Sequence, residues 1–449
     1  MDSSDQAKRI KELEEHVAQL EKENAGLRSK SAAEEVTEPK ETNDDENGKN
    51  KDKLSQEQIE RYSRQLLIAG GFGVTGQLAL LNASVLIVGA GGIGSTVILY
   101  LAASGVGKLT IVDFDEVDIS NLHRQIIHKS LDVGMNKAES ARTAVEALNP
   151  SIQVQILKIP LSSSNALDVV SQHDCVVDAS DNPLTRYTVN DACVLGNIPL
   201  VSGSAIGYEG QLTVYNYKGG PCYRCLYPKQ STSEGSKTCS DNGVLGPVPG
   251  LVGILQAMET IKVLTGFGHV MSDRLVMYDS LQCSFLRIKK PPKQSTCAVC
   301  GPNATIKTME DSYNASSSSR GPSCGFTASA PPVPTSNDIA CTDYSLLRKK
   351  NQPHILLDVR VKEQYELCNL DGAINLPLDE LEGKLSYVED ISGGTKPIYC
   401  LCRRGIASAI ATNTLLKAQQ EHPNLHSVIN IKGGLNSWRD TVDVSFPKY

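Results

Sequence analysis

One cysteine of this sequence stands where its thiol could act as a nucleophile. The stretch "IYCLCRRGIASAIA" begins with a short apolar run, passes Cys402 and two arginines, and ends in a helical pattern. Backbone N–H groups of the loop and of the helix N-terminus would face the sulfur, and Arg403 and Arg404 add positive charge. These features stabilise a thiolate or a persulfide anion, so the loop predicts sulfur chemistry at Cys402. We expect Cys400, two residues earlier, to lie in the core of a strand.

A nucleotide site is predicted far upstream of this loop. Gly89, Gly91 and Gly94 form a G-x-G-x-x-G motif between an apolar strand pattern and a helical pattern. Backbone N–H groups at such a helix N-terminus bind phosphate, and Asp113 at the end of the next strand can bind ribose hydroxyls. By itself the motif favours a dinucleotide dehydrogenase. Glycines needed only for tight helix–sheet packing are the other alternative.

Charged and amide side chains around this motif favour a triphosphate instead. They lie mostly at predicted strand ends and are Arg61, Arg64, Asn121, Arg124, Lys137, Asp178, Asp181, Asn182 and Arg186. Hydride transfer needs no such cluster, whereas a reaction at a triphosphate does, because cations offset phosphate charge and a carboxylate holds magnesium. Any one of these side chains could be a solvated surface residue. Together at the ligand-binding edge of a sheet, they indicate chemistry on ATP.

Two C-x-x-C pairs predict a metal site. Cys222 with Cys225 and Cys297 with Cys300 can close a tetrahedral sulfur site, and zinc is the usual occupant of four thiolates. The gap between the pairs is longer than that of a zinc ribbon, and a redox C-x-x-C is the alternative. The chain has 13 cysteines, which in a reducing compartment indicate metal ligands, reactive thiols or core residues rather than disulfides.

The elements that must position these residues are of α/β type. Alternating strand and helix patterns over residues 54–308 predict a doubly wound, mostly parallel sheet, and a smaller α/β pattern follows over 340–449. Residues 1–30 predict a helix with a heptad seam, either a dimeric coiled coil or a lone amphipathic helix. We expect a disordered acidic linker over 31–53 and a Ser/Pro linker over 309–339.

The overall composition excludes some classes of protein. The net charge of −7 argues against a protein that coats nucleic acid. No apolar run reaches the ~18 residues of a spanning helix, and the N-terminus lacks an apolar signal core. We therefore expect a cytosolic protein with no membrane segment and no direct nucleic-acid partner.

Residues 54–308 resemble the superfamily of ubiquitin-activating enzymes and the bacterial relatives that activate sulfur-carrier proteins. The motifs "RYSRQ", "GAGGIGS", "DFDEVDISNLHRQ", "GMNKAES" and "SDNPLTR" match in order. The resemblance implies a Rossmann-like, ThiF-type adenylation domain that uses ATP and Mg²⁺. It implies an ATP site made of Gly92, Asp113, Ser120, Asn121, Leu122, His123, Arg124, Lys137, Asp181 and Asn182. Asn121, Arg124 and Lys137 would contact the phosphates, and Asp181 would hold magnesium.

The same resemblance implies roles that spacing alone leaves open. Arg64 would be an arginine finger that reaches the neighbouring subunit, which implies a homodimer. The two C-x-x-C pairs would bind one structural Zn²⁺ per chain. Cys239 lies in a polar, Gly/Pro-containing stretch and would bond to the carrier protein, as a thioester or a disulfide. An incidental exposed thiol is the alternative for Cys239.

Residues 340–449 resemble a rhodanese domain. The resemblance rests on "LLDVR", "NLDGAINLPL", the Cys402 loop and "IKGGLNSW". Inactive rhodanese modules usually lack the cysteine, so Cys402 argues for active sulfur transfer. The loop departs from the commonest rhodanese form, because Ala407 replaces an arginine. Whether the donor is thiosulfate or a protein persulfide is therefore open.

The two domains together resemble the adenylyltransferases and sulfurtransferases that activate the small subunit of molybdopterin synthase and the ubiquitin-related modifier. The resemblance implies that ATP adenylates the C-terminal glycine of such a carrier. A persulfide on Cys402, loaded by a donor such as a cysteine desulfurase, would then give a thiocarboxylate, with Cys239 helping its release. The product would serve molybdenum cofactor synthesis and tRNA wobble-uridine 2-thiolation. One alternative is a conjugating-type activator with a non-essential rhodanese domain, and another is a binding module without chemistry.

Overall fold

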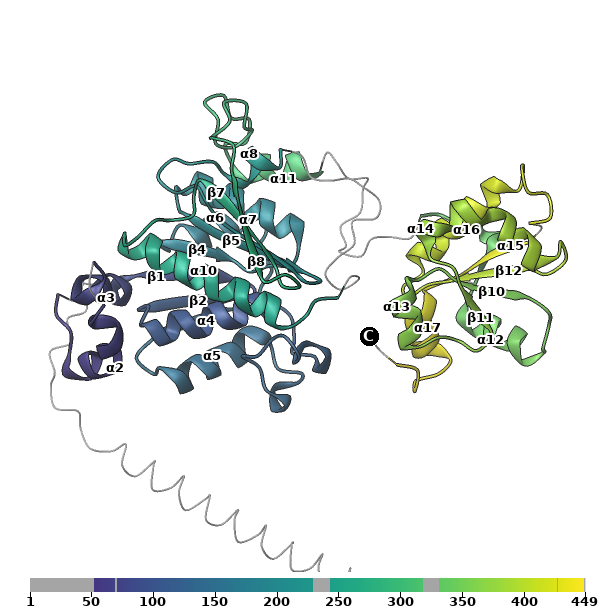
Figure 1. The fold of residues 1–449 in the computed structure, drawn as a ribbon, viewed down its shortest axis with the longest axis horizontal. Coiled ribbons are helices and arrows are strands. Elements are labelled where there is room, and N and C mark those ends of the chain that lie inside the picture. Colours follow the sequence, from purple (N-terminus) through teal and green to yellow (C-terminus); the bar gives the residue numbers. More distant parts are fainter. Residues whose placement is uncertain (1–51, 69–70, 229–242, 318–330, 426, 448) are drawn as a thin grey trace, which may run out of the picture.

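The computed structural model of the 449-residue chain describes residues 52–68, 71–228, 243–317, 331–425, 427–447 and 449. These residues form two α/β units, each built on its own sheet (Figure 1). The helix predicted over 1–30 and nearly all of the linker predicted over 31–53 lie outside the described residues.

The first unit is built on an eight-stranded sheet with the order β3-β2-β1-β4-β5-β6-β7-β8. Strands β3 to β5 of this order are parallel, and β6, β7 and β8 join them antiparallel. The strands are β1 Ser84–Val88, β2 Lys108–Val112, β3 Gln153–Leu157, β4 Cys175–Asp178, β5 Leu200–Ile206, β6 Glu209–Tyr215, β7 Arg274–Asp279 and β8 Ser284–Lys289. The order reverses between β1 and β4, which is where ligands bind in such sheets. The predicted doubly wound fold is confirmed.

Helices cover both faces of this sheet (Figure 1). They are α2 Gln56–Leu66, α3 Gly73–Asn82, α4 Gly92–Ser104, α5 Lys137–Leu148, α6 Ala166–Val170, α7 Pro183–Leu195, α8 Tyr223–Leu226, α10 Pro247–Thr265 and α11 Met309–Ser317, with short 3₁₀ turns η1 Ile119–Asn121 and η2 Ser130–Asp132. Strand β1 explains the two layers, because Val85 and Ile87 pack in one hydrophobic cluster while Leu86 and Val88 pack in the other. A strand that is apolar on both faces must be covered on both.

Helix α10 departs from the expectation that no apolar run is long enough to span a membrane. Pro247–Thr265 meets the length and composition of a spanning helix, and it is the one such helix in the described part of the chain. However, Val248, Val252 and Ala257 of α10 belong to the main hydrophobic cluster of the first unit. Packing of this kind is typical of the core helix of a globular domain.

The segment 309–339, expected to be a linker, is structured at both ends. Helix α11 begins where Asp311 accepts hydrogen bonds from the backbone nitrogens of Lys307 and Thr308, and Ser312 donates to buried Asp191. At the other end, strand β9 Asp338–Ile339 pairs with the second sheet. The Ser- and Pro-rich composition does not reveal the bond of Ser312 or the pairing of β9, because both depend on partners far away in the sequence. Residues 318–330 lie outside the described residues.

The second unit is built on a five-stranded parallel sheet with the order β11-β10-β12-β13-β9. Its other strands are β10 Ile355–Asp358, β11 Ala373–Asn375, β12 Ile398–Leu401 and β13 Val428–Ile431. Its helices are α12 Cys341–Lys349, α13 Lys362–Leu367, α14 Leu378–Leu381, α15 Leu385–Ser392, α16 Ile406–Ala418 and α17 Gly434–Thr441, with 3₁₀ turns η3 Thr335–Asn337 and η4 Glu382–Lys384. Cys400 is fully buried within β12, as predicted for a core residue.

Candidate active sites and metal centre

The ends of three strands meet at the predicted nucleotide-binding edge of the first sheet. The register pairs Val88 of β1 with Val112 of β2 on one side and with Asp178 of β4 on the other. The ladder then continues one step, because the N–H of Gly89 donates to Val112 and that of Ala179 donates to Val88, each at 2.9 Å. The motifs that follow β1, β2 and β4 are far apart in the sequence, but they therefore start side by side at the same edge of the sheet.

The glycine-rich loop leads directly into helix α4. Gly89 has a φ of +99°, and a Cβ at Gly94 would lie 2.0 Å from the carbonyl oxygen of Gly89. Only glycine fits at both positions, since one needs a left-handed backbone and the other has no room for a side chain. Helix α4 starts at Gly92, and no described side chain caps its N-terminus. Its first N–H groups are thus available to a phosphate.

The Ala90 peptide inside this loop is held from both sides. Its N–H donates to Oδ2 of Asp113 at 2.8 Å, and its carbonyl lies 3.0 Å from Nε2 of His128. Ser140 lies 2.8 Å from the other ring nitrogen of His128 and donates to Asp132. Because a carbonyl oxygen can only accept, Nε2 of His128 carries the proton donated to Ala90, and burial lowers the pKa of the ring. Sequence reasoning missed His128, because only the fold brings it against the loop.

Asp113 carries a carboxylate where a ribose is expected. Its Oδ1 accepts the N–H of Asp115 at 2.9 Å while its Oδ2 holds Ala90. Burial raises the pKa of Asp113, and the neighbouring charge of Lys137 lowers it in part. The carboxylate is thus fixed in direction, and Lys137 stabilises its charge.

Lys137 is the first residue of helix α5, at the same edge of the sheet. Asn136 caps the helix by accepting the N–H groups of Ala138 and Glu139. The cap fixes the position from which the Lys137 side chain extends, and this side chain is mostly buried. Its Nζ donates to Asp115 at 2.9 Å. The exposed Asp115 carboxylate is thus paired with a cation that is predicted to bind phosphate.

The segment 120–124 forms a turn stabilised by its own side chains. Oδ1 of Asn121 accepts the N–H of Asp118 at 3.1 Å, and Ser120 donates to the same aspartate at 2.7 Å. The guanidinium of Arg124 donates to the carbonyl of Ser120 at 2.9 Å and lies 2.7 Å from Nε2 of His123. Burial and the charge of Arg124 lower the pKa of His123, so a neutral imidazole accepts from Arg124. Arg124 is therefore oriented, although His123 itself is exposed.

Of the polar residues that follow β4, some form structural hydrogen bonds and one has a side chain available to a ligand. Asn182 caps helix α7 by accepting the N–H of Leu184 at 2.9 Å. Arg186 is committed to fully buried Asp178, with 3.2 Å between Nε and Oδ2, and to the carbonyl of Ser180. Asp181 is exposed. Of this group, Asp181 has the side chain free to meet a metal ion.

Arg64 lies on the last turn of helix α2 and is exposed. The helix is anchored by buried Tyr62, whose hydroxyl accepts from Asn149 at 2.9 Å. Within the described part of the chain, no hydrogen bond or ion pair joins Arg64 to the nucleotide-binding edge of its own sheet. The structure therefore does not bring Arg64 together with the other predicted ATP residues of the same chain.

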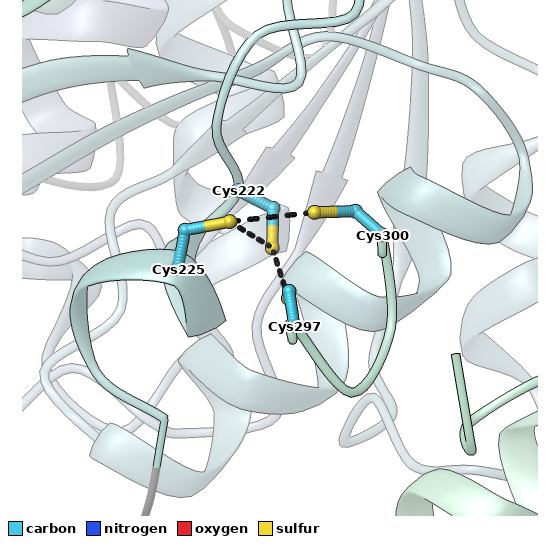
Figure 2. Close-up of side chains that lie close together, drawn as sticks. All are labelled: Cys222, Cys225, Cys297 and Cys300. Carbon is cyan, nitrogen blue, oxygen red and sulfur yellow. Dashed lines mark hydrogen bonds between the residues drawn. The ribbon is translucent and has the colours of Figure 1, made fainter. Parts of the chain in front are cut away.

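The four cysteines of the two C-x-x-C pairs come together in one cluster, although 75 residues separate them (Figure 2). Their sulfurs lie within 4.8 Å of one another, with 3.6 Å between Cys222 and Cys297 and 3.4 Å between Cys225 and Cys300. A tetrahedral zinc with Zn–S bonds of about 2.3 Å has sulfurs about 3.8 Å apart. The donor set and its spacing therefore fit a structural zinc ion with no open position.

The Cys402 loop follows strand β12 as predicted. The sulfur of Cys402 accepts the N–H of Gly405 at 3.1 Å and lies 3.2 Å from the hydroxyl of Ser408, on the first turn of helix α16. Gly405 has a φ of +85°, which turns its N–H toward the sulfur. The expected backbone donor is thus present. Ser408 was not singled out from the sequence, although its place six residues after Cys402 puts it on the helix that faces the sulfur.

Cys239 lies outside the described residues. The chain that follows it returns to the nucleotide-binding edge, because Val244 bridges to Gly207 and Gly246 packs against the carbonyl of His123. Cys324 also lies outside the described residues. Cys283, on the turn between β7 and β8, is exposed.

A cavity of about 630 Å³ lies at the opposite ends of the parallel strands. Two of its polar lining groups, Asp174 and Asn216, are already engaged. Asp174 accepts from the backbone and hydroxyl of Ser84, and Asn216 donates to the carbonyls of Cys193 and Ile198. These two groups hold loops together.

Comparison with known proteins identifies the two domains that carry these sites. The model of the ThiF family matches residues 62–299, and that of the rhodanese-like domain matches residues 342–441. Adenylyltransferase and sulfurtransferase MOCS3 of Aedes aegypti is 43% identical over 400 residues, 88% of this chain and 90% of that protein. The chain belongs to the MOCS3 family of adenylyltransferases and sulfurtransferases.

MOCS3 proteins of distant organisms are similar to the same degree. The Arabidopsis thaliana protein is 42% identical over 410 residues (88% of this chain, 86% of that protein), and the Dictyostelium discoideum protein is 40% identical over 419 residues (88% and 98%). Among solved structures, Escherichia coli MccB with MccA-N7isoASN has a TM-score of 0.49 and 26% identity, over 54% of this chain and 74% of that chain.

Membership of the MOCS3 family confirms the predicted enzyme class. The chain combines an ATP-using adenylation domain with a sulfurtransferase domain. The relatives are named for adenylyl transfer and sulfur transfer. The dehydrogenase activity that the glycine motif favours by itself was therefore wrong.

Proposed function

We propose that the chain adenylates the C-terminal glycine of a ubiquitin-like sulfur carrier and then converts that carboxylate to a thiocarboxylate. The observation that carries this proposal is the presence on one chain of a strand edge where helix α4 begins without a side-chain cap and a cysteine whose sulfur accepts a backbone N–H. A carboxylate does not react with sulfur nucleophiles, whereas an acyl-adenylate has a good leaving group. The two sites thus perform successive steps on one carboxylate.

In the first step, a carboxylate oxygen of the carrier attacks the α-phosphorus of ATP, and pyrophosphate leaves. The N–H groups at the start of α4 and the cations Arg124 and Lys137 receive the phosphates, and Asp113 receives the ribose. Asp181 would hold Mg²⁺, which would offset the negative charge of the departing pyrophosphate. Before ATP arrives, Asp115 neutralises Lys137, and the phosphates replace it.

Arg64 completes this site in a homodimer. Its exposure on α2 and its lack of partners at its own nucleotide edge fit a side chain that reaches the ATP of a second subunit. A cation supplied in this way would stabilise negative charge on the reacting phosphate.

In the second step, the terminal sulfur of a Cys402 persulfide attacks the acyl carbon, and AMP leaves. This forms an acyl disulfide between the carrier and Cys402. The Cys239 thiolate then attacks Sγ of Cys402, so the thiocarboxylate leaves and a Cys239–Cys402 disulfide remains, which a dithiol reductant must reduce. Gly405 and Ser408 stabilise the sulfur anion at Cys402.

The remaining groups have supporting roles in this proposal. One Zn²⁺ held by the four clustered cysteines ties α8 to the segment after β8. A protein persulfide, such as that of a cysteine desulfurase, loads Cys402 in the cytosol. The carriers are the small subunit of molybdopterin synthase and the ubiquitin-related modifier, so the product serves molybdenum cofactor synthesis and tRNA wobble-uridine 2-thiolation.

Carrier-dependent exchange of labelled pyrophosphate into ATP tests the first step separately from the second. Exchange should require the carrier and magnesium, and Cys402→Ala should exchange at the wild-type rate while transferring no labelled sulfur. A Cys402→Ala variant that still makes thiocarboxylate would instead favour a conjugating-type activator with a non-essential rhodanese domain. Absence of exchange in the wild type would favour a binding module.

A further inference from the structure

The aromatic ring of Tyr449 joins two arginines of the second unit. The guanidinium carbon of Arg403, the residue next to Cys402, lies 4.9 Å from the centre of the Tyr449 ring, and that of Arg360 lies 5.7 Å from it. The Tyr449 hydroxyl also accepts a hydrogen bond from Nη1 of Arg360. A residue 47 positions beyond the nucleophile therefore contacts the side chain beside it.

Arg360 is a fixed anchor for this ring. Its guanidinium forms a bidentate pair with Asp358, with 2.9 and 3.0 Å between Nε and the two carboxylate oxygens. It also donates to the carbonyls of Gln364 and Cys368 at 2.9 and 2.8 Å. Both charged residues are almost completely buried. An arginine with every branch engaged cannot change rotamer, so the hydroxyl of Tyr449 is held in place.

Arg403 is the second cation that the ring contacts. An arginine side chain in a loop has many rotamers, and its charge acts on a neighbouring sulfur only while the side chain stays near. A ring face within about 6 Å of a guanidinium attracts it, because the ring quadrupole is negative at the face. The ring of Tyr449 thus restricts the positions that Arg403 can take beside Cys402.

We propose that Tyr449 is a positioning residue that holds the Arg403 guanidinium next to the Cys402 loop, so that a fixed cation accompanies the sulfur anion. The inference rests on the proposed role of Cys402 as the sulfur carrier of this chain and adds a residue to that site. Tyr449 acts through Arg403 and does not touch the reacting sulfur.

The test is the rate at which iodoacetamide alkylates Cys402 in the full chain at neutral pH, followed by mass spectrometry of the peptide that contains it. The variants are Tyr449→Phe, Tyr449→Leu, Arg403→Ala and the double variant Tyr449→Leu with Arg403→Ala. Tyr449→Leu should slow alkylation about threefold or more, because the cation loses its ring. Tyr449→Phe keeps the ring face but loses the hydroxyl bond to Arg360, so it should alkylate at a rate between those of Tyr449→Leu and the wild type.

The double variant decides the mechanism. If Tyr449 acts through Arg403, the double variant should alkylate at the same rate as Arg403→Ala alone. The proposal would be overturned if Tyr449→Leu is alkylated at the wild-type rate. It would also be overturned if the double variant is slower than Arg403→Ala by the factor that Tyr449→Leu alone produces. Equal slowing in Tyr449→Phe and Tyr449→Leu would also overturn it, since the hydroxyl and not the ring would then matter.

Failure of this inference and failure of the proposed function give different results. The alkylation rate needs neither carrier, ATP nor sulfur donor, so it reports Tyr449 and Arg403 even if Cys402 transfers no sulfur. Thiocarboxylate formation, measured beside it with Cys402→Ala, reports the proposed function. Thermal unfolding of each variant shows whether the second unit remains folded, and Tyr449→Phe gives an answer if the leucine variant does not fold.

Discussion

The backbone nitrogen of Gly405 lies 3.1 Å from the sulfur of Cys402 and donates its proton to it. This contact depends on a second glycine, because Gly434 packs against the same loop and a Cβ there would lie 2.1 Å from the carbonyl oxygen of Cys402. The sulfur, the loop and the start of helix α17 thus form one close-packed cradle. Its geometry, and not the cysteine alone, prepares the site for an anion.

A methyl group at Gly434 should therefore disable sulfur transfer. Gly434→Ala forces the Cys402 loop to shift, and misplacement of a reacting atom by about 1 Å can reduce the rate about a hundredfold. Thiocarboxylate formation measures the loss, while pyrophosphate exchange should be unchanged. Gly372→Ala is the matched control, since Gly372 also has a positive φ but no atom lies within 4 Å of its added Cβ. Equal loss in both variants would mean that backbone strain, and not the cradle, is responsible.

Removal of the Ser408 hydroxyl should slow sulfur transfer without unfolding the domain. A hydrogen bond to a charged group contributes about 1.5–3 kcal/mol, which corresponds to a rate decrease of about 10- to 100-fold. Single-turnover transfer from Cys402 persulfide in Ser408→Ala measures this effect. Ser392→Ala removes an equally buried hydroxyl that donates to the carbonyls of Glu389 and Asn424, and it should transfer sulfur normally.

Loss of the Lys137 charge should impair adenylation only. Lys137→Met keeps the bulk of the side chain but removes the cation predicted to meet the phosphates, so pyrophosphate exchange should fall about a hundredfold or more. Lys129→Met, which removes an exposed lysine from the same region, should exchange normally. An unchanged exchange rate in Lys137→Met would show that its role is limited to the ion pair with Asp115.

As the pH is lowered, the affinity for ATP should begin to fall at a higher pH than it would if Asp113 had the pKa of an ordinary carboxyl group. Burial raises the pKa of Asp113 above 3.8, and the ionised form is the one that accepts hydrogen bonds from Ala90 and a ribose. Affinity is thus present above the raised pKa and is lost as the pH falls through it. Titration calorimetry at several pH values measures the midpoint. In Asp113→Asn this acidic decrease should be absent, whereas the exposed Asp168→Asn should keep it.

Zinc removal should destabilise the first unit. A strong chelator should release one zinc ion per chain, measured by elemental analysis, and should lower the free energy of unfolding by several kcal/mol because the metal binds only the folded cluster. Cys300→Ser should have the same effect on metal content. Cys283→Ser, which removes an exposed cysteine outside the cluster, should retain one zinc ion. A chain that unfolds at the same temperature with and without the chelator would contradict a structural metal.

The strands and the functional residues at their ends could be predicted, because both are recognised from short stretches of sequence. Apolar runs such as "SVLIV" and "IYCL" are long enough to be strands, and the glycines or cysteine that follow them must then lie at a strand end. The four clustered cysteines were predictable for a related reason, since each pair places two ligands on one short turn.

The rest depended on contacts that the sequence does not display. Nothing near His128 indicates that its ring will hold the Ala90 carbonyl, and nothing near Arg186 indicates that buried Asp178 will engage it. Tyr449 is a single aromatic residue whose importance follows only from its contacts with Arg360 and Arg403. Long-range pairing decides which polar groups are structural and which remain available to a substrate.

The most direct test of the central claim is the intact mass of a ubiquitin-like carrier ending in Gly-Gly, after incubation with this protein, Mg-ATP and a persulfide donor. The account predicts a gain equal to the replacement of one oxygen atom by one sulfur atom, and it predicts no gain when Cys402→Ala replaces the wild type. A carrier that becomes adenylated, or bonded to the protein, but gains no sulfur from the wild type would contradict the assignment of Cys402 as the sulfur donor.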